Sequence, residues 1–206
     1  MHKRHLTVIV LLASVLMSLA AASASARSIE ITNSERGFRI TWNPLRLEAA
    51  GRSIECPVTL EGNFAVHTFA KRAGTRVASV SELAVGTCTR GSVSVLIESL
   101  PWEITYNSFG GTLPTITELK FNTIREAFQV NLEGIICLAT TRVEQPARGI
   151  SRISSGAVTG FRMDETALIE TTGGFFCTLP GKAHFAGEAS SITVRGGTEA
   201  MRVRLI

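Results

Sequence analysis

Residues 53–61 read Ser-Ile-Glu-Cys-Pro-Val-Thr-Leu-Glu, and apolar and polar side chains alternate along the stretch. The apolar set is Ile54, Cys56, Val58 and Leu60. Because successive side chains of a β-strand point to opposite faces, this period of two predicts a strand with one buried face. Pro57 lacks a backbone N–H, which predicts that the strand lies at a sheet edge or carries a bulge.

The same alternation recurs along the chain, which indicates that most of it is built from strands. It appears at residues 38–42, 45–48, 102–106, 128–132 and 201–205. Denser apolar runs at 92–98 and 135–141 predict central strands. Glycine-containing turns separate the runs at roughly ten-residue intervals, a pattern typical of all-β sandwiches and barrels. We expect a single all-β domain, with a two-layer sandwich favoured and a barrel as the alternative.

Two segments are harder to assign. Residues 115–133 contain neither Gly nor Pro and fit a helix, but Thr and aromatic residues favour two strands joined at Asn122-Thr123. Residues 148–160 are rich in Ser and Gly and predict a loop.

The first 26 residues have the pattern of a secretory signal peptide. Lys3 and Arg4 precede an apolar run, and small residues then lead to a cleavage site between Ala26 and Arg27. An uncleaved anchor helix is the alternative. Cleavage would leave residues 27–206 as an exported all-β domain with no membrane span, secreted or held at the cell surface. A duplicated unit, with halves at about 27–110 and 111–206, stays open as a second description of this domain.

All four cysteines lie in the exported part, where the compartment favours disulfides. Three connectivities are open to Cys56, Cys88, Cys137 and Cys177. We favour Cys56–Cys88 and Cys137–Cys177, so that each half of the chain carries its own bridge. The wide spacing of the four residues argues against a zinc site.

The composition argues against most catalytic chemistries. The chain of 206 residues is 45% apolar and 18% charged, and Asp164 is its only Asp among 17 acidic residues. Only His67 and His184 remain after the expected cleavage, so a Ser-His-Asp triad or a metal centre has few candidates. No glycine-rich phosphate motif occurs, and no cofactor is expected.

The charge does not indicate a nucleic-acid partner. Removing the signal peptide lowers the formal charge from +4 to +2, and arginines are spread along the chain without the concentrated basic patch that nucleic acids require.

One local stretch fits a carbohydrate site. Trp102 and Tyr106 flank Glu103 in a predicted strand, and a sugar ring could stack on an aromatic beside a carboxylate. The alternation itself opposes this, since it turns Glu103 away from the two aromatic side chains. The two aromatic side chains share one face of the strand, and Trp102 and Tyr106 remain our candidate ligand contacts.

The segments Leu100-Pro101-Trp102 and Ser108-Phe109-Gly110-Gly111-Thr112-Leu113-Pro114, with the paired cysteines, resemble a set of exported bacterial proteins of unknown function. The resemblance implies export and covers most of the exported chain, but brings no activity or site residues. Enzymatic activity stays open, and the sequence favours a non-enzymatic extracellular or cell-surface interaction module whose partner is a protein or a glycan. The alternatives are a carbohydrate-binding or carbohydrate-active protein that uses aromatic stacking and a Glu, and a structural component of a surface layer.

Overall fold

The computed structural model describes residues 28–49, 51–173, 177 and 181–206. The expected signal peptide at 1–26 and its cleavage site between Ala26 and Arg27 lie outside the described residues. The strands are β1 (Ser28–Ile31), β2 (Gly37–Ala49), β3 (Arg52–Phe64), β4 (Thr68–Ala70), β5 (Arg76–Val85), β6 (Ser92–Val95), β7 (Trp102–Gly110), β8 (Glu118–Ile124), β9 (Ala127–Leu132), β10 (Ile135–Thr141), β11 (Ala147–Ser154), β12 (Ala157–Gly173), β13 (Lys182–Val194) and β14 (Val203–Leu205), with a single 3₁₀ turn η1 (Ile97–Ser99) in the described part.

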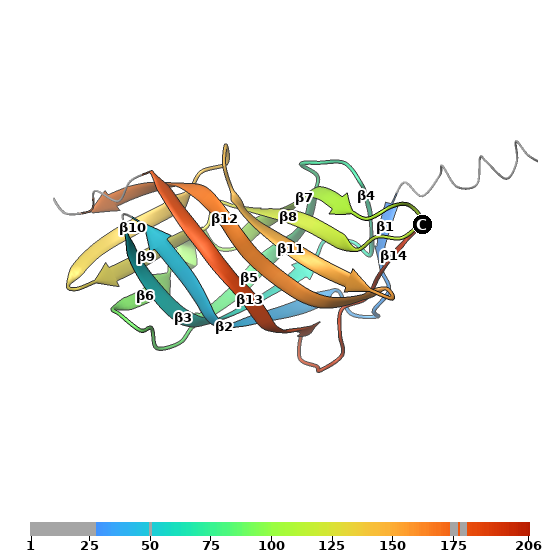
Figure 1. The fold of residues 1–206 in the computed structure, drawn as a ribbon, viewed down its shortest axis with the longest axis horizontal. Coiled ribbons are helices and arrows are strands. Elements are labelled where there is room, and N and C mark those ends of the chain that lie inside the picture. The colour runs from blue at the N-terminus through green and yellow to red at the C-terminus, as the bar shows by residue number, and fades with distance from the viewer. Residues whose placement is uncertain (1–27, 50, 174–176, 178–180) are drawn as a thin grey trace, which may run out of the picture.

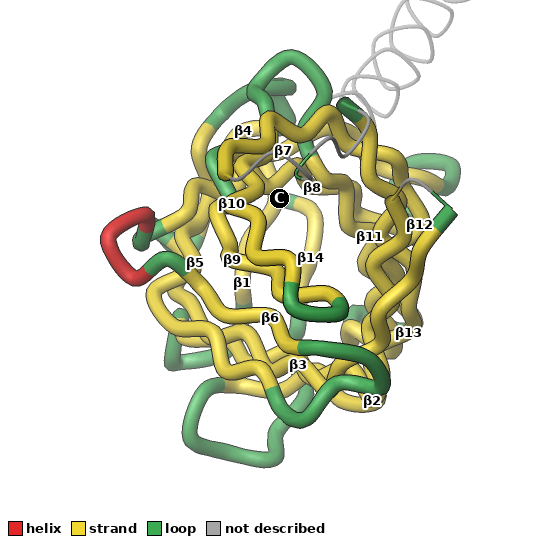
Figure 2. Tube along the Cα trace, turned by 90° about the vertical axis from the view of Figure 1, so that its left-hand side faces the viewer, coloured by secondary structure: helices red, strands yellow, loops and turns green. Residues whose placement is uncertain are grey.

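Eight of the strands close into a barrel. They pair in the order β11-β8-β7-β5-β3-β2-β13-β12, and β12 pairs back onto β11. All the pairings are antiparallel, and a view along the long axis shows the strands as a ring (Figure 2). The all-β class is confirmed, and the architecture is the barrel rather than the favoured sandwich. Pairing of β11 with β12 removes the free edges that two separate sheets would have.

The barrel wall is formed by different strands toward its two ends. Residues 157–163 of β12 pair with β11, whereas residues 169–173 of the same strand pair with β10. Beyond β10 come β9 and then β6, which lies beside β5. The wall therefore consists of long shared strands together with a first arc (β7, β8 and β11) and a second arc (β6, β9 and β10), which lie toward opposite ends of the molecule (Figure 1).

A small second sheet lies at the end of the molecule where the chain terminates. Its order is β14-β1-β4, so strands from the two ends of the described chain pair with each other (Figure 1). Ile29, Ile31 and Phe69 of this sheet are buried in the main core. This end of the barrel is thereby covered by apolar side chains.

Three local expectations need correction. Residues 148–160, expected as a loop, form most of β11 and the start of β12. Residues 92–98, expected as a central strand, form the edge strand β6 and the start of η1. Residues 115–133 do form two strands, but β8 continues through Asn122-Thr123 and ends at Ile124.

Pro57 lies in the central strand β3, opposite a bulge in β2. The β2–β3 register shifts between Trp42 and Leu45, where Asn43-Pro44 provides the extra residues. The irregular pairing expected at Pro57 is present, but the extra residue belongs to β2 rather than to the strand of Pro57, and it accommodates a proline away from an edge.

Both expected disulfides are present: Cys56 bonds to Cys88 and Cys137 bonds to Cys177. Each bridge ties a barrel strand to a segment that follows it in sequence. Within the described residues, the structure contains no helix of the length and hydropathy needed to cross a membrane.

Candidate ligand-binding site in the barrel interior

The inward faces of the strands do not fill the barrel completely. A first cavity of about 80 Å³ and a second of about 70 Å³ are lined almost wholly by apolar and aromatic side chains. Four residues line both of them: Trp42, Leu60, Glu126 and Met163. The two cavities therefore meet at this group of four, which we call the central ring.

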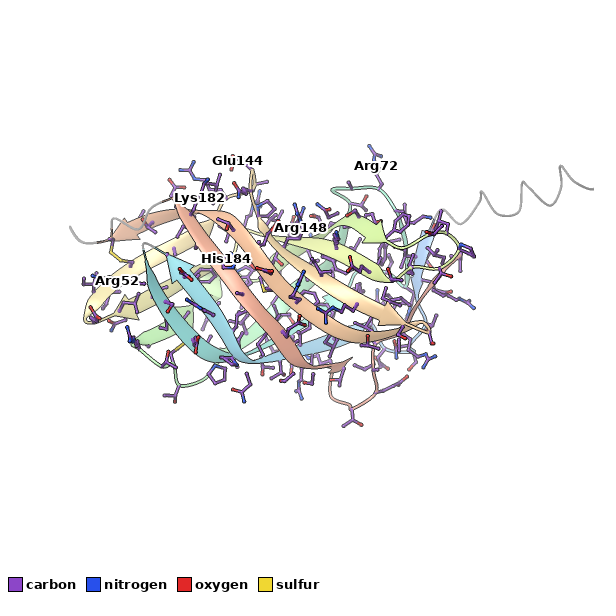
Figure 3. All side chains as sticks on the ribbon, in the orientation of Figure 1. Arg52, Arg72, Glu144, Arg148, Lys182 and His184 are labelled. Atoms are coloured by element: carbon purple, nitrogen blue, oxygen red, sulfur yellow. A yellow bond between two sulfur atoms is a disulfide. The ribbon has the colours of Figure 1, made fainter. Side chains whose placement is uncertain are left out.

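A third cavity of about 20 Å³ continues the row, since it shares Leu47, Ile54 and Phe128 with the first. Its lining includes Arg52, whose side chain is 53% exposed and lies at one end of the molecule (Figure 3). The row of cavities thus leads from the central ring toward the end of the barrel opposite the β1-containing sheet.

Glu126 sits where the wall passes from the first arc to the second. It lies in the short connection between β8 and β9, directly after Arg125, whose φ of 62° interrupts the extended backbone between the two strands. Its backbone N–H donates to Thr141 Oγ1 at 3.0 Å, and its carbonyl accepts from the Thr141 N–H at 2.8 Å. These two bonds to the end of β10 fix the backbone and hold the side chain against the cavities.

The Glu126 carboxyl is the one ionisable group among the described residues that line the first two cavities. Burial raises its pKa to about 8, although a hydrogen bond with the Thr141 side chain opposes the change. The physical cause is desolvation, because a carboxylate loses its hydration in an apolar interior. The carboxyl is therefore protonated through the neutral pH range. Its Oε2 atom has no hydrogen-bond partner among the described residues.

The two tryptophans of the interior differ in one respect. Trp102 Nε1 donates to Ser99 Oγ at 2.8 Å, and that hydroxyl donates to the Leu96 carbonyl at 2.6 Å. Trp42 is 1% exposed, and its Nε1 has no partner in the described part of the chain. A buried N–H without a partner costs about 1–3 kcal/mol. Of the three buried side-chain polar atoms in this condition, two belong to the central ring.

The candidate contacts Trp102 and Tyr106 are both 2% exposed. Trp102 lines the first cavity and packs edge-on against Phe128, whereas Tyr106 packs near Phe69. Glu103 lies on the outer face, 3.4 Å from Arg76. The aromatic residues are thus inside the barrel and the neighbouring carboxylate is outside.

The structure brings together part of the triad considered from the sequence. His184 Nε2 lies 3.3 Å from Asp164 Oδ1, and its Nδ1 lies 3.4 Å from Thr166 Oγ1. The three residues lie on the outward side of β12 and β13, where His184 is 38% exposed (Figure 3). None of the three residues lines any of the three cavities described above.

The structure places the second histidine, His67, with its Nδ1 3.3 Å from the Ile31 carbonyl. Among the described residues, no three His, Cys, Asp or Glu side chains gather in a way that could hold a metal ion.

Sequence reasoning missed Trp42 and Glu126 as a pair. The signal for Glu126 was present, because positions 126, 128 and 130 share one face of an alternating stretch, and Phe128 and Val130 are buried. Extending the alternation by two residues would have placed a carboxyl in the core. No sequence pattern shows that Trp42 lines the same two cavities.

Comparisons with protein-family models, with curated proteins and with solved structures give no match to this chain.

Proposed function

We propose that this protein is a non-enzymatic binding module that carries a small apolar molecule inside its barrel. The observation that supports this proposal is the row of apolar cavities that meets at the central ring. Proteins fill their interiors to crystal-like density, so a row of adjacent apolar cavities in a disulfide-bridged core is unusual for a purely structural domain. Together, the first two cavities approach the size of an engineered apolar cavity of about 150 Å³ that binds benzene.

The lining favours an apolar ligand over a sugar. Beside Glu126, the polar side chains around the first two cavities are Thr123 and Ser151, and both line the second. A sugar carries a hydroxyl on most of its carbons, and each would need a partner in this mostly apolar interior. The aromatics considered for stacking are buried rather than displayed on a surface. The interior therefore supports the carbohydrate alternative less well.

We also propose that the protein acts outside the cytoplasm, secreted or at the cell surface. Two disulfides support this location, because such bonds persist in oxidising compartments. A carrier or sensor of a small apolar molecule is a natural role there.

The proposal is tested by filling the central ring. Leu60→Trp places a larger side chain between the two cavities, and Thr59→Trp adds the same ring one residue away on the outer face of β3. The measurement is the melting temperature of the oxidised protein with and without ethylbenzene. At a ligand concentration tenfold above Kd, the stabilisation is about 1.4 kcal/mol, which is a shift of a few degrees.

We expect the shift in the wild type and in Thr59→Trp, and none in Leu60→Trp. A wild-type protein whose melting temperature does not respond to ethylbenzene or to similar apolar compounds would contradict the proposal.

A further inference from the structure

We propose that the central ring recognises a hydroxyl group, so that the ligand of the barrel is a neutral apolar alcohol held between Trp42 and Glu126. This inference rests on the proposed function and names the ligand class for that same site. It uses an observation that an apolar cavity alone does not explain. Two polar atoms without partners belong to residues that line both cavities, and their requirements are complementary.

The two side chains differ in what they can offer. An indole N–H only donates, and Trp42 Nε1 therefore needs an acceptor. The protonated Glu126 carboxyl has one O–H donor and accepts at its remaining lone pairs, and its Oε2 atom has no partner among the described residues. A hydroxyl is the smallest group that accepts from the first and donates to the second. One hydroxyl in the central ring would therefore satisfy both atoms.

Polar groups close to Trp42 Nε1 and Glu126 Oε2 do have hydrogen-bond partners, so the lack of a partner is confined, in this part of the described structure, to these two atoms. Trp102, which lines the same first cavity, has its indole N–H satisfied by Ser99. The backbone of Glu126 is likewise satisfied by Thr141. The fold thus provides partners for other polar groups around the central ring, but not for these two side-chain atoms of residues that line both cavities.

An ammonium group fits the central ring less well. It could pair with an ionised Glu126, but it has no lone pair to accept from Trp42. It would also have to be stripped of water in an interior where the first two cavities have no second charged lining residue. A water molecule could bridge the two atoms, but it would leave the apolar remainder of both cavities without contacts.

Both polar atoms are almost fully covered by the described residues. The hydroxyl would reach them through small rotations of the two side chains, which border open space on two sides. Binding would therefore change the surroundings of the Trp42 indole and leave those of Trp102 as they are.

The test uses three ligands of similar size on the oxidised exported chain. Benzyl alcohol donates and accepts, its isomer anisole only accepts, and ethylbenzene does neither. The dissociation constants are measured by calorimetry for the wild type, Trp42→Phe, Glu126→Leu and Glu126→Gln. For each ligand, the dissociation constants of variant and wild type are compared, so that the free energy of removing the ligand from water cancels.

We expect Glu126→Leu to weaken the binding of benzyl alcohol five- to tenfold, roughly one hydrogen bond, with little effect on the binding of ethylbenzene. Trp42→Phe should weaken the binding of benzyl alcohol and of anisole, but not that of ethylbenzene. Glu126→Gln keeps a carbonyl acceptor and should retain most of the preference for the alcohol. In ¹H–¹⁵N spectra, benzyl alcohol should shift the Trp42 indole signal and leave that of Trp102 in place.

Several outcomes would overturn the inference while leaving the proposed function intact. One such outcome is an equal loss of affinity for all three ligands, and another is no loss of affinity for benzyl alcohol in Trp42→Phe or Glu126→Leu. A Trp42 indole signal that does not shift would also overturn it. So would tighter binding of benzylamine, measured as a fourth ligand, than of benzyl alcohol through Glu126. Failure of ethylbenzene and of both oxygen-containing ligands to bind would instead contradict the proposed function.

Discussion

At the scale of single residues, Glu126 is the group whose charge state matters most. Its carboxyl is buried where an unfolded chain would leave it in water, so folding raises its pKa from 4.5 to about 8. An acid with a raised pKa binds a proton in the folded state over a pH range where the unfolded state has lost it. The free energy of unfolding should therefore fall as pH rises from about 4.5 to 8.

This argument predicts the behaviour of Glu126→Gln. The wild type should lose about 1.4 kcal/mol of stability per pH unit in that range from this group, about 5 kcal/mol in all. Glutamine has nearly the same shape and does not ionise, so the variant should match the wild type at pH 4 and exceed it by several kcal/mol at pH 8. Denaturant unfolding at pH 4, 6 and 8 measures the difference.

The contributions of the other titrating groups to the pH dependence of stability cancel when the two proteins are compared. One of these is Glu61 on the outer face: burial opposes its ionisation, but hydrogen bonds from Arg39 and Arg195 outweigh that effect and lower its pKa. Stability curves for wild type and Glu126→Gln that stay parallel from pH 4 to pH 8 would show that Glu126 is not desolvated.

At the scale of elements, β11 explains why part of the fold could not be foreseen. Its buried positions are Ala147, Gly149, Ser151 and Ile153, so three of four inward residues are small or polar. The apolar alternation that predicted β3 and β7 is therefore absent, although the strand is just as regular. The missing volume comes from Phe161 on β12, which packs over Gly149 and lies edge-on to Trp42. Only the tertiary structure shows that compensation.

The packing of Phe161 over Gly149 gives a second prediction. A Cβ at position 149 would lie 2.0 Å from the Phe161 ring, well inside van der Waals contact. We expect Gly149→Ala to cost about 1–3 kcal/mol by overpacking. The matched control is Gly160→Ala in the neighbouring strand, where a Cβ meets nothing nearer than the Arg152 side chain at 3.8 Å.

Urea unfolding of both variants is the measurement, and the control should stay within about 0.5 kcal/mol of the wild type. Adding Phe161→Leu to Gly149→Ala should recover part of the loss, since the smaller side chain vacates the contested space. Equal stability of the two alanine variants would mean that the Phe161 ring moves aside without cost.

At the scale of the whole molecule, the sequence predicted the class and the disulfides but not the closure. Alternation along a strand reports which face is buried, and the inner face of a sandwich and that of a barrel look alike in this respect. What distinguishes them here is the pairing of β11 with β12, together with the length of β2, β3, β12 and β13, which run through both arcs. Neither feature has a signature in the residues themselves.

The two disulfides should contribute about equally to stability and unequally to binding. They close segments of 32 and 40 residues, and each is expected to stabilise the fold by roughly 3–4 kcal/mol. Only Cys56 lines the first cavity. Replacing Cys56 and Cys88 by Ala should lower both the stability and the affinity for ethylbenzene, whereas replacing Cys137 and Cys177 should lower the stability alone. Unfolding and calorimetry on the two double variants would separate the effects, and unchanged affinity in the first would contradict this placement.

The pairing of β2 with β13 also has a consequence for the order of events in folding. Phe38 lies opposite Val194, so the barrel cannot close until the chain has been synthesised through β13. Contacts between residues so distant in sequence form slowly, because a long loop must first be closed. During that interval the cavity-lining strands have no partner to cover them and are prone to aggregate. A chaperone that holds the incomplete chain, or a ligand that binds as the barrel closes, would act at this late stage.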